Sequence, residues 1–352
     1  MKHKLLTLVL AVVVIVSLVL IGCAKPAPTT QTIRLVYGSH DPPVGWEVKN
    51  CSEPWVQEVA KATNGVVQIE GHYGESLFKG TDALEAVKGG QADLAWLAMG
   101  FFPGVASLGE VISLPFLPIP DSKTGGLALW DLYDKYPSFQ KQFTDQNIKV
   151  LNFCVLGPFF TITSDKQVKT LDDFNGLKLR VHGGPPTDML KALGGVPVPV
   201  GINEVYPNVE KGVLDGAMLP WEAMISFKVY EVTKYYTYAP FYSLSFAVAM
   251  NLDKWNSLPP DIQEAIMGTL GGPRERSGWW SYNMSDTSAI AGRKIVQEAG
   301  TPMIEYTVPA EEVDKMREVG ASPIWDKWVA DNEAKGFSEA QDILNTALEL
   351  LK

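Results

Sequence analysis

One arrangement of strands and helices occurs twice in this chain, and it limits the fold more than any other feature of the sequence. Each copy reads strand, helix, strand, helix, strand. The first copy predicts strands at 33–37, 66–70 and 94–98 and helices at 52–63 and 81–88. The second copy predicts strands at 177–181, 196–200 and 216–219 and helices at 186–193 and 203–211. Strands that alternate with helices favour parallel sheets with helices on both faces.

Glycine marks the end of a helix at four joints of these copies, namely Gly65, Gly90, Gly195 and Gly212. We expect each of them to adopt the left-handed conformation that glycine adopts at the least cost. Ligands of such sheets bind beyond the carboxyl ends of the strands. Two lobes that face each other would therefore enclose a cleft.

The chain beyond residue 228 departs from the repeated pattern. An apolar run from Leu244 to Met250 predicts a strand that crosses between the lobes. A helix predicted over 274–298 would be about 37 Å long, which is enough to lie along both lobes. Amphipathic helices are predicted over 310–352. We therefore predict an α/β fold with two lobes, in which mixed sheets are flanked by helices and a strand crosses between the lobes. Lobe I is predicted at 32–156 and 245–285, and lobe II at 157–244 and 286–352.

The N-terminal segment has the features of an export signal. Lys2 and Lys4 precede a largely apolar stretch from Leu5 to Ile21, and Gly22 is followed by Cys23. A small residue before cysteine resembles the bacterial lipobox, so we expect a signal peptide at 1–22, lipidation of Cys23 and a Pro-rich tether at 23–31. A retained membrane anchor is the alternative. The mature protein would lie in the periplasm or on the cell surface, held to the membrane by its lipid.

Net charge excludes one class of partner. The chain has 30 Lys+Arg and 40 Asp+Glu, and removal of residues 1–22 makes it more acidic still. Nucleic-acid binding is not expected, because it depends on clustered basic residues. Cys51 and Cys154 show no spacing typical of a disulfide framework, and we expect them to be unpaired, although an oxidising compartment permits a disulfide.

Short motifs follow one another in a fixed order along most of the mature chain. They are Gly90–Asp93 (GQAD), Leu114–Leu117 (LPFL), Lys169–Val181 (KTLDDFNGLKLRV), Ala192–Pro199 (ALGGVPVP), Glu204–Tyr206 (EVY), Lys211–Gly216 (KGVLDG) and Asn251–Pro260 (NLDKWNSLPP). Together they resemble the solute-binding proteins of tripartite ATP-independent periplasmic (TRAP) transporters, the DctP-like family. The resemblance implies a two-lobed periplasmic-binding-protein fold, of type II, whose lobes are joined by hinge strands and close around an organic acid. It also implies delivery of that acid to a membrane permease driven by an ion gradient.

Arg180 is the main candidate for binding the acid. It is the only arginine between Arg34 and Arg274, and it ends a predicted strand that faces the cleft. A guanidinium holds a carboxylate through two parallel charge-assisted hydrogen bonds. In the resembled family an arginine at this place in the motif pairs with the substrate carboxylate. The alternative is an ion pair with an acidic neighbour such as Asp172.

Backbone groups could assist Arg180. Gly183, Gly184 and two prolines open the helix that follows, and free N–H groups at a helix start can help to hold an anion. A plain tight turn is the alternative.

Two departures from the family pattern bear on the ligand. Family members that bind dicarboxylates or sialic acid often have Asn where this chain has Leu219, and many carry a second arginine in the strand that here reads Gly157–Thr163 (GPFFTIT). A site with one arginine favours a monocarboxylate with an apolar or aromatic body, because burial of a second, unpaired carboxylate is costly. The aromatic candidates for its wall are Trp46, Trp96, Phe159, Phe160 and Trp221, for each of which core packing is the alternative.

Other polar candidates are weaker. Tyr206 lies at a predicted helix start and His40 lies in the loop after the first strand, and either could contact the ligand or serve structure alone. Asp93 and Asp215 occupy matching positions in the two copies and are expected to stabilise turns. The histidines, His72 and His182 among them, show no metal-ligand spacing, and we expect neither a metal nor a cofactor.

Two other functions remain alternatives. The sequence has no GxSxG, HExxH, Walker or GxGxxG motif, so an enzyme is the less favoured interpretation. A lipoprotein that presents its ligand to a membrane sensor would look much the same as a transport component. We expect a monomer.

Overall fold

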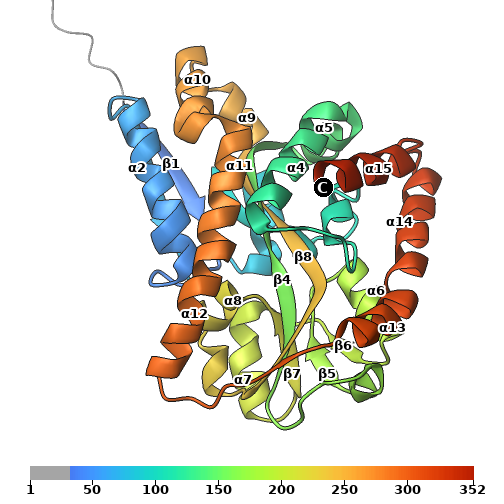
Figure 1. Ribbon diagram of the computed structural model, residues 1–352. Helices are drawn as coiled ribbons and strands as arrows, with labels where there is room; N and C mark the ends of the chain where they lie inside the picture. The colour runs from blue at the N-terminus through green and yellow to red at the C-terminus, as the bar shows by residue number, and fades with distance from the viewer. Residues whose placement is uncertain (1–31) are drawn as a thin grey trace, which may run out of the picture. The chain divides into compact units, whose positions relative to one another are not determined.

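A single mixed sheet of nine strands runs through the computed structural model, which describes residues 32–352 (Figure 1). The strand order is β2-β1-β3-β8-β4-β7-β5-β6, and β9 pairs with β8. The strands are β1 (Ile33–Gly38), β2 (Val67–His72), β3 (Leu94–Ala98), β4 (Ile148–Thr163), β5 (Lys178–Arg180), β6 (Val196–Val198), β7 (Gly216–Leu219), β8 (Tyr235–Asn251) and β9 (Ile304–Thr307). The predicted signal peptide, the Cys23 lipidation site and the tether lie outside the described residues.

Two long antiparallel strands join the two copies of the repeat. β4 has 16 residues and β8 has 17, which corresponds to roughly 50 Å of extended chain each. β3 of the first copy pairs with the last residues of β8, from Phe246 to Met250, and β7 of the second copy pairs with the last residues of β4, from Phe160 to Thr163. The mixed sheets predicted for the two lobes therefore form one continuous sheet, because both copies are attached to the same pair of strands. The crossing strand predicted at 244–250 is part of β8.

The repeat itself forms as predicted. β1 pairs with β3, and β5 pairs with both β6 and β7, all in parallel. Asp93 Oδ2 accepts a hydrogen bond from the backbone N–H of Val36 at 2.8 Å, and Asp215 Oδ2 accepts one from Lys178 at 2.7 Å. The matched aspartates thus have the same structural role, since each fastens the start of its last strand to the first strand of the copy.

One of the four glycine predictions is wrong. Gly65, Gly90 and Gly212 have φ values of 78°, 75° and 69°, as expected. In the second copy, however, the left-handed residue is Gly194, with φ of 92°, and not Gly195. The helix before it ends at Ala192, so the position that must reverse the chain direction comes one residue earlier than the sequence pattern indicated.

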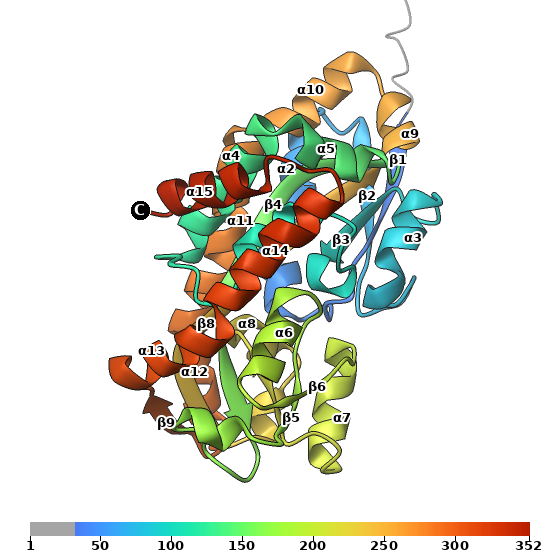
Figure 2. The same ribbon diagram turned by 90° about the vertical axis from the view of Figure 1, so that its right-hand side faces the viewer.

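Helices cover both faces of the sheet and complete the two copies (Figures 1 and 2). α4 and α11 pack on β4, and α14 runs between α6 and α15. The helices are α2 (Glu53–Ala62), α3 (Ala83–Lys88), α4 (Ser122–Lys135), α5 (Pro137–Thr144), α6 (Pro185–Ala192), α7 (Val205–Glu210), α8 (Trp221–Ser226), α9 (Leu252–Asn256), α10 (Pro260–Gly268), α11 (Pro273–Ser281), α12 (Thr287–Glu298), α13 (Ala310–Gly320), α14 (Ser322–Ala334) and α15 (Ala340–Leu350). These observations confirm the predicted α/β class with helices on a mixed sheet.

The long helix predicted at 274–298 contains a π-helical turn. α11 continues through Tyr282–Asp286, a π-helical segment, into α12, and the residues at both junctions keep helical backbone angles. A π turn inserts one extra residue into the helix and often occurs at functional sites. Here it brings Met284 to the pocket described below.

Residues Arg34–Lys352 form one compact unit. The lobe boundaries at 157, 245 and 286 therefore stay a prediction. Cys51 and Cys154 are both buried free thiols. Among residues 32–352, no helix combines the length and the apolar character that a membrane crossing requires.

Candidate ligand-binding site

A pocket with an empty volume of about 330 Å³ lies at the carboxyl ends of strands from both copies of the repeat. His40 and Asp41 follow β1, Arg180 ends β5, and Glu222 lies on α8 just after β7. The remaining lining residues are Phe101, Leu156, Phe159, His182, Ile202, Pro220, Ala223, Phe227, Phe246 and Met284. This is the location at which parallel α/β sheets bind their ligands.

Two other pockets have larger empty volumes, about 560 and 650 Å³. One adjoins Asp121 and Asp286, and the other adjoins Lys327, Lys335 and Asp331. Neither includes an arginine, and their charged groups are mostly acidic or already paired with acidic neighbours, as Lys327 is with Asp331. The Arg180 pocket is therefore the candidate for an organic anion.

Arg180 is buried with only 1% of its surface exposed, and its contacts leave part of its guanidinium without a partner. Nε donates to Val200 O at 3.3 Å, and Nη1 and Nη2 lie 3.4 and 3.1 Å from the two ring nitrogens of His182. A guanidinium has five N–H groups. Since only three contacts are made among the described residues, at least two N–H groups remain available to a ligand.

The charge of Arg180 is not balanced within residues 32–352. It forms no ion pair there with a carboxylate, and Asp172, the alternative partner considered above, is an exposed residue. Burial lowers the pKa of Arg180 to about 10, so the group stays protonated at neutral pH. Burial and the charge of Arg180 lower the pKa of His182 well below its usual range, so His182 is neutral. A buried cation without a counter-ion favours the uptake of an anion.

Aromatic rings surround the rest of the pocket. Arg180 lies over the ring of Phe101 at 5.9 Å, and Phe159 meets the His182 ring edge-to-face at 5.4 Å and stacks on Tyr242 at 4.5 Å. Phe246 forms another part of the lining, and the ring of Trp96 stacks on it with 5.0 Å between the ring centroids. Such walls fit a flat or apolar ligand body.

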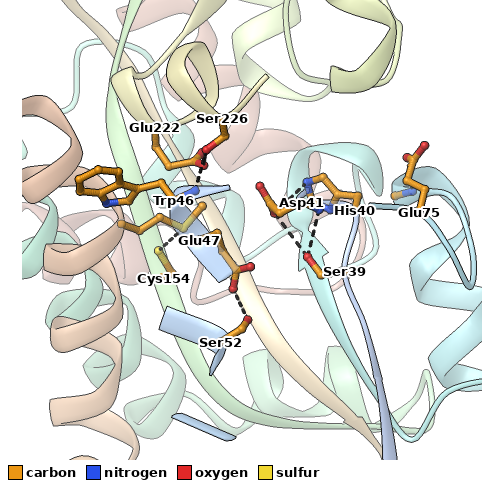
Figure 3. Close-up of polar contacts among 12 residues, drawn as sticks. Ser39, His40, Asp41, Trp46, Glu47, Ser52, Glu75, Cys154, Glu222 and Ser226 are labelled. Atoms are coloured by element: carbon orange, nitrogen blue, oxygen red, sulfur yellow. Dashed lines mark hydrogen bonds and ion pairs between the residues drawn. The ribbon is translucent and has the colours of Figure 1, made fainter. Parts of the chain in front are cut away.

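Three carboxyl groups gather beside the pocket (Figure 3). Asp41, Glu47 and Glu222 are at most 2% exposed, and Asp41 and Glu222 line the pocket directly. Glu222 Oε1 accepts a hydrogen bond from Ser226 at 2.7 Å, and Glu47 accepts one from Ser52. Burial raises the pKa of all three groups, and the charge of Asp41 raises those of Glu47 and Glu222 further.

The structure brings three of the predicted site residues together: Arg180, His40 and Phe159 all line the pocket. His40 is 5% exposed and its Nε2 lies 3.6 Å from Asp41 Oδ2. Within the described residues, His40 Nδ1 is buried without a hydrogen-bond partner.

The other predicted residues do not line this pocket. Trp46 donates from Nε1 to Asn283 O at 2.8 Å and so ties the loop after β1 to the π turn. Trp96 is fully buried between Phe246 and Trp280. Tyr206, on α7, lies near Glu231, and the pKa of Tyr206 is raised by desolvation and by the charge of Glu231. A second core cluster contains the remaining apolar candidates, which are Phe160, Leu219 and Trp221.

Most backbone N–H groups around Gly183 are not available to an anion. Gly183 N–H donates to Gly100 O at 3.0 Å. α6 begins with two prolines, which lack an N–H, and the next two N–H groups, of Thr187 and Asp188, both point to Gly184 O. Among the described residues, the N–H of Gly184 has no partner, but Gly184 borders the pocket of Lys327 and not the Arg180 pocket. Anion binding at this helix start stays a prediction.

Sequence reasoning missed several lining residues, above all Phe101, Glu222, Phe227 and Phe246. The rule that selected Arg180 would also have found Phe101 and Glu222, since both follow the end of a strand of the repeat. Phe246 gave no such signal, because it lies inside the long apolar run of β8.

The chain matches known proteins along most of its length. The family model for bacterial extracellular solute-binding protein, family 7 (DctP), matches residues 39–332. The chain belongs to this family. A C4-dicarboxylate-binding periplasmic protein DctP of Rhodobacter capsulatus is 28% identical over 278 residues, which cover 76% of this chain and 78% of that protein.

Two solved structures of family members are similar over 91% of this chain and 98% of their own. A TRAP solute-binding protein of Rhodoferax ferrireducens with copurified benzoate has a TM-score of 0.83 and 29% identity. A TRAP periplasmic solute-binding protein of Bordetella bronchiseptica with bound (R)- and (S)-mandelate has a TM-score of 0.81 and 27% identity. The DctP family member described here thus has the fold of TRAP solute-binding proteins and is itself an extracytoplasmic solute-binding protein for an organic acid.

A metal has no evident place in this site. Within residues 32–352, no three His, Cys, Asp or Glu side chains are grouped so that they could hold a metal ion.

Proposed function

We propose that this TRAP solute-binding protein captures an aromatic monocarboxylate in the Arg180 pocket. The observation that carries the proposal is the buried guanidinium of Arg180, which has unused N–H groups, no carboxylate partner among the described residues and phenyl rings around it. A carboxylate that accepts two charge-assisted hydrogen bonds from Arg180 would satisfy that charge. The ring of the ligand would replace water against Phe101, Phe159 and Phe246.

The pocket argues against a dicarboxylate. Arg180 is its one arginine, and its other ionisable lining groups are His40, Asp41, His182 and Glu222. A second ligand carboxylate beside Asp41 and Glu222 would add a like charge to a buried site, which is costly. The benzoate and mandelate bound by the two similar structures are monocarboxylates with a phenyl ring, and they support this choice. The dicarboxylate-binding relative makes dicarboxylates the competitors to be measured.

Capture by hinge closure is the mechanism that we propose. Arg180 and Glu222 belong to the second copy of the repeat, whereas His40, Asp41 and Phe101 belong to the first, so a complete pocket needs both. β4 and β8 connect the copies, and a small bend in these strands would open or close the pocket. A ligand that contacts both copies shifts the equilibrium towards the closed form.

Other parts of the proposal concern location and partners. We infer that the closed protein is recognised by the membrane subunits of a TRAP permease, that it acts as a monomer, and that it releases the acid unchanged rather than converting it. Attachment to the membrane through lipidated Cys23 is likewise proposed. Growth with a labelled fatty acid, followed by detection of label in the wild type but not in a Cys23→Ala variant, tests the anchor.

A ligand screen by thermal unfolding tests the ligand class. Benzoate and phenylacetate are compared with succinate and isophthalate, and benzamide is the matched control that keeps the ring but lacks the charge. A ligand at 100 times its dissociation constant adds about 2.7 kcal/mol to the unfolding free energy. We expect stabilisation by the monocarboxylates and none by benzamide. Greater stabilisation by succinate or isophthalate would overturn the proposal.

A further inference from the structure

Asp41 and Glu222 are buried acidic groups in the wall of a pocket built to receive an acid. Their side chains are 1% and 2% exposed, and they come from different copies of the repeat. Both line the same cavity as Arg180, yet neither forms an ion pair with it. Acidic side chains are rarely buried unless they have a partner. Their presence opposite an apolar ligand body therefore calls for an explanation.

The protein satisfies these carboxyl groups only in part. Asp41 Oδ2 has Ser39 Oγ at 3.5 Å and His40 Nε2 at 3.6 Å, both of which are long contacts. Glu222 Oε1 accepts from Ser226 Oγ at 2.7 Å, and Ser226 is held in place by the backbone N–H of Trp46 at 2.9 Å. Among the described residues, no lysine or arginine pairs with either group. Each carboxyl group thus keeps capacity for a further hydrogen bond.

A third polar group in the same wall also lacks a partner. His40 is 5% exposed, lines the pocket, and has no hydrogen-bond partner for Nδ1 within residues 32–352. Figure 3 shows His40 and Asp41 adjacent to each other, with Glu222 and Ser226 forming a separate pair. Buried polar groups of this kind are normally satisfied, if not by the protein then by water or ligand.

We propose that Asp41 and Glu222 recognise a hydroxyl group on the ring of the acid whose carboxylate binds Arg180, so that the protein selects hydroxylated aromatic monocarboxylates. This inference rests on the proposed function, because it assumes an aromatic acid in the Arg180 pocket. Asp41 and Glu222 are then specificity-determining residues, and the hydroxyl group is both donor and acceptor to them.

The chemistry of the two carboxyl groups favours a neutral hydroxyl over an ammonium group. Burial raises the pKa of both groups, and the charge of Asp41 raises that of Glu222 further. A protonated carboxyl group donates one hydrogen bond and accepts others, as a hydroxyl group does. An ammonium group only donates, and it would need at least one carboxylate that stays ionised.

An unsubstituted ring would leave these groups unsatisfied in the closed pocket. A site built to hydrogen-bond a ligand hydroxyl discriminates against the analogue that lacks it, because its own buried polar groups then lose water without gaining a partner. We expect 3-hydroxybenzoate or 4-hydroxybenzoate to bind at least about tenfold more tightly than benzoate.

Titration calorimetry of the purified protein tests the proposal with four ligands: benzoate, 3-hydroxybenzoate, 4-hydroxybenzoate and 4-(aminomethyl)benzoate. The expected result is tighter binding of one hydroxybenzoate than of the other three ligands. Equal binding of benzoate and both hydroxybenzoates would overturn this inference and leave the proposed function standing. Tightest binding of 4-(aminomethyl)benzoate would overturn this inference, because it would show that Asp41 and Glu222 recognise a cation and not a hydroxyl group. If no aromatic acid binds, the proposed function fails and this inference fails with it.

Two variants of one position separate hydrogen bonding from shape. Glu222→Met removes the hydrogen-bonding group but keeps much of the volume, and it should reduce the preference for the hydroxybenzoate over benzoate to about one. Glu222→Gln is the matched control, since an amide still donates and accepts, and it should keep most of the preference. A preference that survives in Glu222→Met would overturn the role of Glu222. The comparison of ligands on the wild type needs no variant and decides the proposal even if Glu222→Met does not fold.

Discussion

Two arginines are completely buried in this protein, and their surroundings differ sharply. Arg276, on α11, is 0% exposed and donates to Asn152 Oδ1 at 3.2 Å, Thr269 Oγ1 at 2.6 Å and Leu151 O at 2.7 Å, with further bonds to carbonyl groups before α11. Arg180 donates to one carbonyl group and otherwise faces His182. Burial lowers the pKa of both, to about 9 for Arg276 and about 10 for Arg180.

The comparison separates a structural arginine from a binding one. Every nitrogen of Arg276 has an oxygen partner in the protein, so its charge is solvated internally and contributes to the link between α11 and β4. Arg180 is equally buried, but protein groups satisfy only some of its N–H groups. A bound ligand therefore has to supply the remaining hydrogen-bond acceptors. Buried charge alone does not mark a binding site, whereas buried charge with unused donors does.

Replacement of Arg180 should give the largest effect. Arg180→Met removes two charge-assisted hydrogen bonds to the ligand, each of which contributes about 1.5–3 kcal/mol. We expect the affinity for any carboxylate ligand to fall by a factor on the order of 100 or more, measured by titration calorimetry. Unchanged binding in this variant would show that the acid is held elsewhere. Arg180→Lys is the control for charge without the planar donor pair, and it should recover only part of the affinity.

Replacement of Arg276 should affect stability instead. Arg276→Met leaves several buried carbonyl groups without donors, and we expect the free energy of unfolding to fall by about 2–3 kcal/mol in urea titrations. The folded variant should still bind its ligand with near wild-type affinity, since no atom of Arg276 lines the pocket. If Arg276→Met lost more binding free energy than unfolding free energy, Arg276 would contribute to ligand binding, and the distinction between the two arginines would fail.

The ligand-free stability of the Arg180 variant sharpens the comparison further. Because Arg180 is an uncompensated buried charge, its replacement by Met should leave the free energy of unfolding unchanged or raise it by about 1 kcal/mol. Urea unfolding of ligand-free Arg180→Met and Arg276→Met, side by side, should therefore show a loss of stability for Arg276→Met and none for Arg180→Met. Destabilisation of both variants by similar amounts would contradict it.

The buried carboxyl groups predict a smaller, pH-dependent effect. The pKa of Glu47 is raised well above its usual range by burial and by the charges of Asp41, Glu222 and Glu53. The folded state therefore binds a proton more tightly than the unfolded state, so this contribution to stability is present below the unfolded pKa of about 4.3 and is lost as pH rises through the folded pKa.

A variant of Glu47 isolates that effect. Glu47→Gln cannot ionise, so its stability relative to the wild type should rise by about 1.4 kcal/mol for each pH unit above the unfolded pKa, until the folded pKa is passed, measured by urea unfolding at each pH. His40 contacts Asp41, whose charge acts on Glu47, so a His40→Gln background serves as the control. A stability difference that does not change with pH would mean that Glu47 is ionised in the folded protein.

Much of the fold was predictable from the sequence, because the repeated strand–helix pattern and its glycines act locally. The strand 216–219 was predicted with the same bounds as β7, and 94–98 with the same bounds as β3. The joining of the two copies into one sheet was not predictable, since it depends on the pairing of β4 with β8, which are far apart in the sequence. Local patterns do not encode such pairings.

The site was predictable where position along a strand decided the outcome. Arg180 was found because it ends β5. Position along a strand did not decide between Phe159 and Phe160. They are neighbours on β4, and their side chains point to opposite faces of the sheet. Phe159 lines the pocket and Phe160 packs against Trp221 in the core. Two consecutive phenylalanines give no pattern that tells the faces apart. Glu222 was missed because acidic residues are seldom buried.

The π turn at Tyr282–Asp286 has a consequence for how one helix can serve two halves of a protein. Each residue of an α-helix advances the direction of its side chain by about 100°, and a π turn takes up one extra residue by making the turn wider. α11 can thus face α4 and β4, while α12 turns Gly292 towards Trp221 and packs on α8. Counted along the sequence from α11, the residues of α12 are therefore displaced by one position from the register of a regular helix, and this displacement sets which side chains of α12 face α8. The irregular turn works as a one-residue shift in sequence register between the surface that α11 covers and the surface that α12 covers.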